Sequence, residues 1–538
     1  MISDEPGETR MNSEAEHPFR TEYPYCRRLV GESRWRQFEG SCQSPPGSES
    51  FYRTLRDTFE ESPFIGDLAR LEGAIEAAAS IQLPARGSFE RIAVNPTLSV
   101  LDLGWRHLPS LMNDPDGAPE PQKGREFVLA YRHPESGNVI SRAAGNDDLL
   151  ALKLLADEIP RKQAAEEAGI PPAALDQAVD RAVGTGLLIA PPSAIRRSET
   201  LFSIPEGFEE RFLRADVFTL QWHITQACDL HCKHCYDRSA RTSLPYETAL
   251  SVLEGFYAFC EAKHVRGQIS FTGGNPLLHP RFLELYRRAS DLGFALAVLG
   301  NPASREDIEA IVEIEMPVYY QVSLEGLREH NDAVRQAGHF DRTLSFLDLL
   351  REFRIYSMVM LTLTDANIDQ VLPLADLLQR RTDLFTFNRL SLVGEGVHLR
   401  LPSQEAYRRF CEAYLEAATR NPVIGLKDNL LNRLLYKRGS GIFGGCAGYG
   451  CGAAFNFMTV LPDGEVHACR KFPSPIGNVL TSSILEIYDS KAAGLYRAGS
   501  EACASCAIRP VCGGCLAVAY SSGIDIFRER DPFCPGPL

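Results

Sequence analysis

Cysteine is the residue type whose number and spacing could do chemistry in this chain. There are 15 cysteines, and most of them lie in two groups. Three form a short loop: Cys228, Cys232 and Cys235. Eight fall within the last 93 residues: Cys446, Cys451, Cys469, Cys503, Cys506, Cys512, Cys515 and Cys534. In a reducing compartment, clustered cysteines are more often ligands of a metal or an iron–sulfur cluster than disulfides. We therefore predict metal or cluster sites in both groups.

Length and composition limit the class of protein that could carry such sites. A chain of 538 residues is long enough for roughly three to four domains. Its hydrophobic share of 44% and charged share of 23% are those of an ordinary globular protein. No apolar run is long enough for a transmembrane helix, and the acidic N-terminus lacks the apolar core of a signal peptide. We expect a cytoplasmic protein without a membrane partner. The net charge of −14 disfavours broad nucleic-acid binding.

Alternating strand and helix patterns extend over residues 215–425 and would position the cysteine loop. Each predicted strand is followed by an amphipathic helix, and a sixth strand ends the series. Such repeats predict a parallel sheet with right-handed crossovers, either a barrel or part of one. The predicted strands are 216–225, 267–274, 294–301, 317–326, 356–364 and 384–394. In such a fold the site lies at the carboxyl ends of the strands, and the cysteine loop directly follows the first of them.

The N-terminal part has a different pattern. We predict a polar, loosely ordered start over residues 1–60 and an accessory helix at 68–79, within a first region of residues 1–95. Residues 96–200 form a second region, with β segments followed by three short helices and a strand, in a winged-helix-like order. This module could be structural, could bind DNA or could bind a peptide. The acidic chain favours a peptide, which an exposed strand edge can accept as an additional strand.

The tail, residues 440–538, is rich in glycine and cysteine and lacks long periodic runs. We expect a small core there, held together by metal or cluster ligation. Four cysteines stand apart from both groups. Cys260 and Cys411 fall in helical patterns and are predicted core residues, whereas Cys26 and Cys42 could form a metal or redox pair.

The cysteine loop resembles that of the radical S-adenosylmethionine (radical SAM) superfamily. Three thiolates can hold three irons of a [4Fe–4S] cluster, which leaves the fourth iron open to a small molecule. The resemblance implies that this iron binds the amino and carboxylate groups of S-adenosylmethionine. Reductive cleavage then gives a 5′-deoxyadenosyl radical that abstracts a hydrogen atom. The alternative is an incomplete zinc site, which would lack the fourth ligand of a closed structural site.

Further motifs are similar to the cofactor-binding segments of that family. Gly273, Gly274, Asn275 and Pro276 end the second predicted strand, where the family has Gly-Gly-Glu-Pro and binds the methionine amino group. The difference is Asn275 in place of glutamate. The segment Val322-Ser323-Leu324-Glu325-Gly326, followed by Arg335, is similar to the family segment that contacts the ribose and the cofactor carboxylate. The resemblance thus implies that S-adenosylmethionine is bound by these residues: His234, Gly273, Gly274, Asn275, Pro276, Ser323 and Arg335.

The tail resembles the SPASM extension of peptide-modifying radical SAM enzymes. By analogy, one auxiliary [4Fe–4S] cluster takes Cys446, Cys451, Cys469 and Cys515, and a second takes Cys503, Cys506, Cys512 and Cys534. The last gap of two residues is shorter than the usual three and leaves the division of Cys512 and Cys515 open. With the cluster of the loop, this predicts three [4Fe–4S] clusters. Two zinc sites are the alternative for the tail.

Arg470 and Lys471 follow Cys469, at the place where sulfatase-maturing relatives carry an aspartate proposed as a base. An arginine cannot serve as a general base at ordinary pH, so formylglycine formation is disfavoured. The basic pair could instead steer an acidic peptide or an electron donor, or lie in a solvated turn. The N-terminal segments are similar to accessory domains of peptide-maturation partners, and the whole arrangement resembles maturases proposed for selenobiotic peptides.

Together the motifs predict a fold and a function. The fold is α/β: a partial (β/α)6 radical SAM barrel, a small cysteine-rich iron–sulfur domain and a mainly helical N-terminal region. The function is a maturase that abstracts hydrogen from a ribosomally made peptide and forms a thioether or a ring at cysteine. Its partners would be the precursor peptide and an electron donor such as flavodoxin or ferredoxin. No catalytic base is predicted. The alternatives are a radical SAM enzyme with a protein or non-peptide substrate, and a non-enzymatic iron–sulfur sensor that binds DNA.

Overall fold

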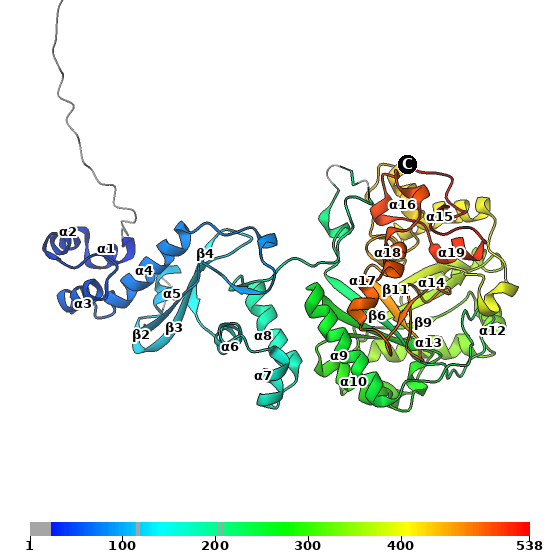
Figure 1. Ribbon diagram of the computed structural model, residues 1–538, viewed down its shortest axis with the longest axis horizontal. Helices are drawn as coiled ribbons and strands as arrows, with labels where there is room; N and C mark the ends of the chain where they lie inside the picture. The colour runs from blue at the N-terminus through cyan, green and yellow to red at the C-terminus, as the bar shows by residue number, and fades with distance from the viewer. Residues whose placement is uncertain (1–22, 114–118, 203, 206–207) are drawn as a thin grey trace, which may run out of the picture. The chain divides into compact units, whose positions relative to one another are not determined.

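The chain forms two compact units, one made mainly of residues 23–191 and the other mainly of residues 192–538 (Figure 1). Among the described residues, no helix combines the length and the apolar character needed to cross a membrane. The computed structural model describes residues 23–113, 119–202, 204–205 and 208–538.

Four helices open the first unit: α1 (Pro24–Val30), α2 (Glu32–Ser41), α3 (Glu49–Thr58) and α4 (Ile65–Ser80). The spacing of apolar residues predicted α4. The prediction of a loosely ordered start is wrong for residues 24–58, and its part before Tyr23 lies outside the described residues. Aromatic side chains explain the difference, because Trp35, Phe38 and Phe51 pack on one another and share a buried core with α4. A few large rings bury enough apolar surface to order a stretch whose composition is polar.

A three-stranded antiparallel sheet follows these helices. Its order is β2 (Ser99–Arg106), β3 (Gln122–Arg132), β4 (Val139–Ala143), so β3 is central. The sheet shares a core with α4. The short helix α5 (Leu108–Asn113), between β2 and β3, was not expected from the sequence. The N-terminal region is therefore α/β, with more strand than a mainly helical region would have.

Three helices and a short strand complete the first unit in the predicted winged-helix-like order. They are α6 (Asn146–Ala156), α7 (Arg161–Ala168), α8 (Pro172–Gly184) and β5 (Leu188–Ile189). β5 pairs with β1 (Ala93–Val94), which lies almost one hundred residues earlier. Leucine, valine and alanine side chains from the helices pack on Leu129 and Tyr131 of β3. The helices and the sheet thus form one continuous module.

Six parallel strands, hydrogen-bonded in chain order, form the centre of the second unit. This confirms the predicted partial barrel. Figure 1 shows the connecting helices on the outside of the strands. The strands are β6 (Val217–Thr225), β7 (Arg266–Gly273), β8 (Ala295–Leu299), β9 (Tyr319–Ser323), β10 (Ser357–Leu363) and β11 (Leu384–Arg389). The helices between them are α9 (Tyr246–Lys263), α10 (Phe282–Asp291), α11 (Arg305–Val312), α12 (Arg328–Val334), α13 (His339–Glu352) and α14 (Val371–Leu378).

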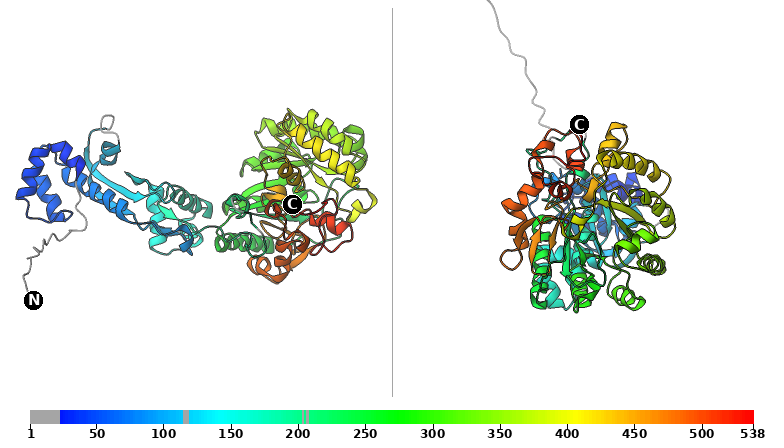
Figure 2. Two further views of the ribbon diagram at one scale, coloured as in Figure 1. Left: turned by 90° about the horizontal axis from the view of Figure 1, so that it is seen from above. Right: turned by 90° about the vertical axis from the view of Figure 1, so that its right-hand side faces the viewer.

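The tail extends the same sheet. β12 (Phe457–Val460) pairs in parallel with β6, and β13 (Glu465–His467) and β14 (Pro475–Asn478) follow it outwards. In both views of Figure 2 the orange and red tail lies against the barrel. The remaining helices are α15 (Gln404–Ala418), α16 (Leu431–Lys437), α17 (Ile484–Asp489), α18 (Lys491–Ala498) and α19 (Leu516–Ser521).

The expectation of a small separate core that depends on metal or cluster ligation is wrong for the tail. Apolar side chains of the tail, such as Phe455, Met458 and Ile487, belong to the same buried core as the barrel strands and helices. The apolar runs of the tail are short because each strand has only three or four residues, so they carry no long period. The barrel supplies the surface on which these short runs are buried.

Candidate functional site

A cavity of about 540 Å³ lies at the carboxyl ends of the barrel strands. The cysteine loop after β6 lines it with Cys228, Cys232 and Cys235. Residues from later strands and loops join them, so side chains far apart in the sequence share one wall. The predicted cofactor residues that line it are His234, Gly273, Gly274, Ser323 and Arg335. Asn275 and Pro276 are buried behind the wall and are not among its lining residues.

The glycine pair holds the cysteine loop in place. A Cβ atom on Gly273 would lie 2.2 Å from the carbonyl oxygen of Thr225, and one on Gly274 would lie 2.1 Å from that of Ala227. The amide of Gly274 donates to the Thr225 carbonyl, and the amide of Asn275 donates to that of Ala227. Only glycine allows this approach. The close neighbour of the pair is thus the backbone that leads into the cysteine loop.

Asn275 occupies the place of the family's glutamate, and its side chain contacts the carboxylate of Asp229. Its side-chain amide donates to Asp229 Oδ1 at 3.1 Å, and the amide of Asn301 donates to the same oxygen at 2.6 Å. Asn301 also lies 3.7 Å from Cys228 Sγ. In this chain the nearby negative charge therefore comes from Asp229 of the cysteine loop, which accepts hydrogen bonds from both asparagines. Sequence analysis missed Asp229 and Asn301, although Asp229 directly follows a loop cysteine.

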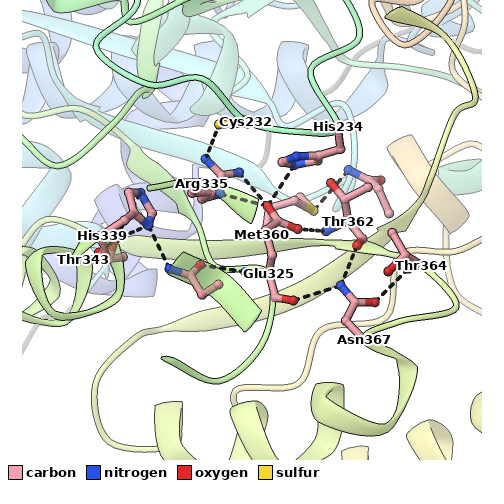
Figure 3. A network of polar contacts seen from close by, with 12 residues as sticks. Cys232, His234, Glu325, Arg335, His339, Thr343, Met360, Thr362, Thr364 and Asn367 are labelled. Carbon is pink, nitrogen blue, oxygen red and sulfur yellow. Dashed lines mark hydrogen bonds and ion pairs between the residues drawn. The ribbon is translucent and has the colours of Figure 1, made fainter. Parts of the chain in front are cut away.

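Glu325 connects two of the predicted cofactor residues (Figure 3). Its Oε1 accepts from Arg335 Nη2 at 2.6 Å and lies 3.0 Å from His234 Nε2. Its Oε2 accepts the backbone amide of Thr362 at 2.8 Å, and Arg335 Nη1 lies 3.7 Å from Cys232 Sγ. Burial alone would raise the pKa of Glu325, but His234, Arg335 and the Thr362 amide lower it overall. The carboxylate is therefore ionised, and it holds the side chains of Arg335 and His234 beside the loop.

A buried histidine contacts Tyr236, which lines the cavity. His223, near the end of β6, is buried, and its Nε2 lies 3.2 Å from the hydroxyl of Tyr236. Burial, together with the nearby charge of Arg470, lowers the pKa of His223 to about 3. This ring can therefore exchange hydrogen bonds but carries no charge at neutral pH. Its place in an apolar strand gave no signal in the sequence.

The tail cysteines gather in two sets of four. Burial raises the pKa of Cys451 to about 12 and those of Cys469 and Cys503 to about 11. These thiols are therefore protonated in the metal-free chain, and a metal would displace their protons. One cavity is lined by Cys446, Cys451, Cys469 and Cys515, and a second by Cys503, Cys506, Cys512 and Cys534. These are the two sets that the SPASM resemblance implied.

Each set has the four thiols that a [4Fe–4S] cluster takes, and the loop has three, so the donor chemistry fits these groups. In the described part of the chain, no group of three or more histidine, cysteine or acidic side chains is arranged to hold a single metal ion.

Cys260 and Cys411 are buried in the core as predicted. Cys26 and Cys42 are free cysteines and form no disulfide.

Comparison with known proteins agrees with this geometry. The model of the radical SAM superfamily matches residues 222–378, and that of the SPASM iron–sulfur cluster-binding domain matches residues 451–515. The chain is a radical SAM enzyme with a C-terminal SPASM domain. Its cofactors are therefore S-adenosylmethionine and [4Fe–4S] clusters. The non-enzymatic sensor that the sequence left open is disfavoured.

The names of individual relatives describe different reactions. The chain is 28% identical to mycofactocin maturase MftC of Mycolicibacterium smegmatis over 350 residues, 60% of this chain and 84% of the relative. It is 26% identical to AdoMet-dependent heme synthase of Methanosarcina barkeri over 347 residues, 59% of this chain and 95% of that enzyme. The crystal structure of Streptococcus suis SuiB bound to precursor peptide SuiA shares the fold. Its TM-score is 0.50 at 16% identity, covering 76% of this chain and 96% of SuiB.

Proposed function

We propose that this enzyme modifies a ribosomally synthesised precursor peptide. The observation that carries the proposal is the extent of the shared fold with peptide-bound SuiB. The match to SuiB covers 76% of this chain. Residues 192–538 make up a smaller share than that, so the match includes part of the N-terminal unit. The likeness to a mycofactocin maturase supports the same class of substrate.

Three [4Fe–4S] clusters and S-adenosylmethionine would be the cofactors. When bound, they supply a 5′-deoxyadenosyl radical that abstracts a hydrogen atom from the substrate. The loop cysteines would hold the first cluster, with Glu325 fixing Arg335 and His234 beside it. The two tail sets would hold the other clusters. A flavodoxin or a ferredoxin would supply electrons.

The N-terminal unit would hold the leader segment of the peptide. Within the described residues, β2 and β4 each pair only with β3, so each has one edge on which a peptide strand could add. Removing residues 1–191 should then weaken peptide affinity strongly while peptide-free cleavage of S-adenosylmethionine continues. Unchanged peptide affinity in this variant would contradict the assignment.

A non-peptide substrate is the second candidate, because the heme synthase of Methanosarcina barkeri is aligned over almost its whole length. The test is anaerobic turnover with S-adenosylmethionine and a chemical reductant. A small cysteine-containing peptide encoded beside the gene would be offered in one reaction and an iron porphyrin in another. We expect 5′-deoxyadenosine and a peptide lighter by two hydrogen atoms, as a thioether or a ring at cysteine requires. Conversion of the porphyrin with no change in the peptide would favour the second candidate.

A further inference from the structure

The turn between β13 and β14 brings two cations to the barrel cavity. Arg470 and Lys471 follow Cys469 in this turn, and both line the cavity that contains the loop cysteines. Arg470 Nη1 lies 3.5 Å from the hydroxyl of Thr272, at the end of β7. Lys471 Nζ donates to the backbone carbonyl of Arg389 at 3.0 Å. Both side chains are half-buried, so the alternative of a solvated turn does not describe them.

These two charges are not neutralised by the protein. Within the residues that the structure describes, neither Arg470 nor Lys471 forms an ion pair. Arg335, the cation beside the cysteine loop, is paired with Glu325.

Other charges at the cavity are already engaged. Arg389 is paired with Asp428 and Asp531. The cavity's own carboxylate, Asp237, accepts from Gln226 and Ser239 and lies 3.6 Å from Arg241. Arg238 is bound to the cysteine loop through the carbonyl of Cys232 and the ring of His231. The tail side of the cavity therefore carries two adjacent positive charges without a counter-charge.

A cluster bound by the first tail set could neutralise part of this positive charge, but not all of it. Lys427 and Lys471 line the cavity of Cys446, Cys451, Cys469 and Cys515. Arg470 lines the barrel cavity and does not line that one. Lys427 can therefore compensate charge on the tail side, whereas Arg470 is available to a molecule in the barrel.

We propose that Arg470, assisted by Lys471, binds a carboxylate of the substrate beside the carbon that loses hydrogen. The class of substrate is then a peptide with aspartate, glutamate or its own C-terminus next to the modified residue. A guanidinium can bind a carboxylate through two parallel hydrogen bonds, and partial burial strengthens the attraction. The inference rests on the proposed peptide function and specifies which peptides enter.

The test is capture of synthetic peptides by the anaerobic holoenzyme with S-adenosylmethionine, which needs no turnover. Two pools of hexapeptides share a central cysteine and differ only in carrying glutamate or glutamine beside it. We expect about tenfold enrichment of the glutamate pool at low salt, as one or two charge-assisted bonds provide. Equal retention of the two pools, including no retention of either, would overturn the inference even if a peptide is turned over.

A charge-reversed variant makes the test specific. R470E/K471E should lose the preference for glutamate and favour a third pool with lysine beside the cysteine. K491E, on the exposed start of α18, is the matched control and should behave like the parent. The affinity of the double variant for S-adenosylmethionine is measured beside that of the parent. Loss of that affinity would instead assign the pair to the cofactor carboxylate and overturn the inference. Selective capture of the glutamate pool without modification of any peptide would contradict the proposed reaction. The assignment of Arg470 and Lys471 as a carboxylate site would still hold.

Discussion

The cysteine loop of the barrel and the cysteine sets of the tail place the same residue type in different surroundings. The loop carries three thiols on the wall of a cavity of about 540 Å³, among charged and polar side chains. Each tail set has four thiols around a cavity of at most about 50 Å³, and most of these thiols pack against the shared apolar core. A missing ligand beside open space leaves room for a small molecule, whereas a complete set in a closed space does not. The number of thiols and the space around them together distinguish a reacting site from a closed one.

The largest effect is expected from removing the loop thiols. Changing Cys228, Cys232 and Cys235 to alanine should abolish cleavage of S-adenosylmethionine and lower iron from about twelve to about eight per chain. The measurement is iron and labile sulfide after anaerobic reconstitution, with 5′-deoxyadenosine as the readout of cleavage. A parent chain with about four irons and zinc in the tail would show that the tail sets are not clusters.

The connection between barrel and tail should be sensitive to one buried acid. Asp531 of the tail receives two hydrogen bonds from Arg389 of β11, both side chains being about 1% exposed. Asp531→Ala leaves the guanidinium short of a counter-charge and should lower the free energy of unfolding by about 3 kcal/mol. Denaturant unfolding measures this change. The control Asp525→Asn, at a more exposed position, should stay within about 0.5 kcal/mol of the parent.

Glu325 tests how much the open site depends on buried charge. Glu325→Gln should cost about 2 kcal/mol of unfolding free energy at neutral pH, because Arg335 and His234 lose their anion. Since the pKa of Glu325 is lowered in the folded state, its contribution is fully present above the unfolded value of about 4.3. It is lost as pH falls through the lowered folded value. The difference between parent and variant should therefore stay constant from about pH 8 to pH 5, and a difference that shrinks within that range would contradict the ion pairs.

The smallest change in stability is expected from replacing a cysteine that packs in the core and binds no cluster. Cys260 is buried in α9, and Cys260→Ala should cost about 1 kcal/mol without any change in iron content. Cys512 is buried to the same extent but belongs to a tail set, so Cys512→Ala should remove about four irons. Equal iron contents in the two variants would mean that the second set holds no cluster.

Much of the barrel was predictable because its signals are local. α9 occupies the place of the helix predicted after the first strand, and the six predicted strands are present with ends shifted by a few residues. The shared tail core was not predictable in this way. β12 has four residues, and its burial depends on pairing with β6, more than 200 residues earlier.

The three cysteine sets, the glycine pair and the order of strands and helices were all predictable from the sequence alone. Each of these depends on the spacing of neighbouring residues, which the chain carries wherever it folds. Only the tertiary structure decided that Glu325 holds His234 and Arg335, that Asp229 receives Asn275, and that Arg470 enters the barrel cavity. Those contacts join residues 10 to 198 positions apart. Their free energy comes from charged and polar groups held together in a partly buried site, and no local period in a sequence indicates it.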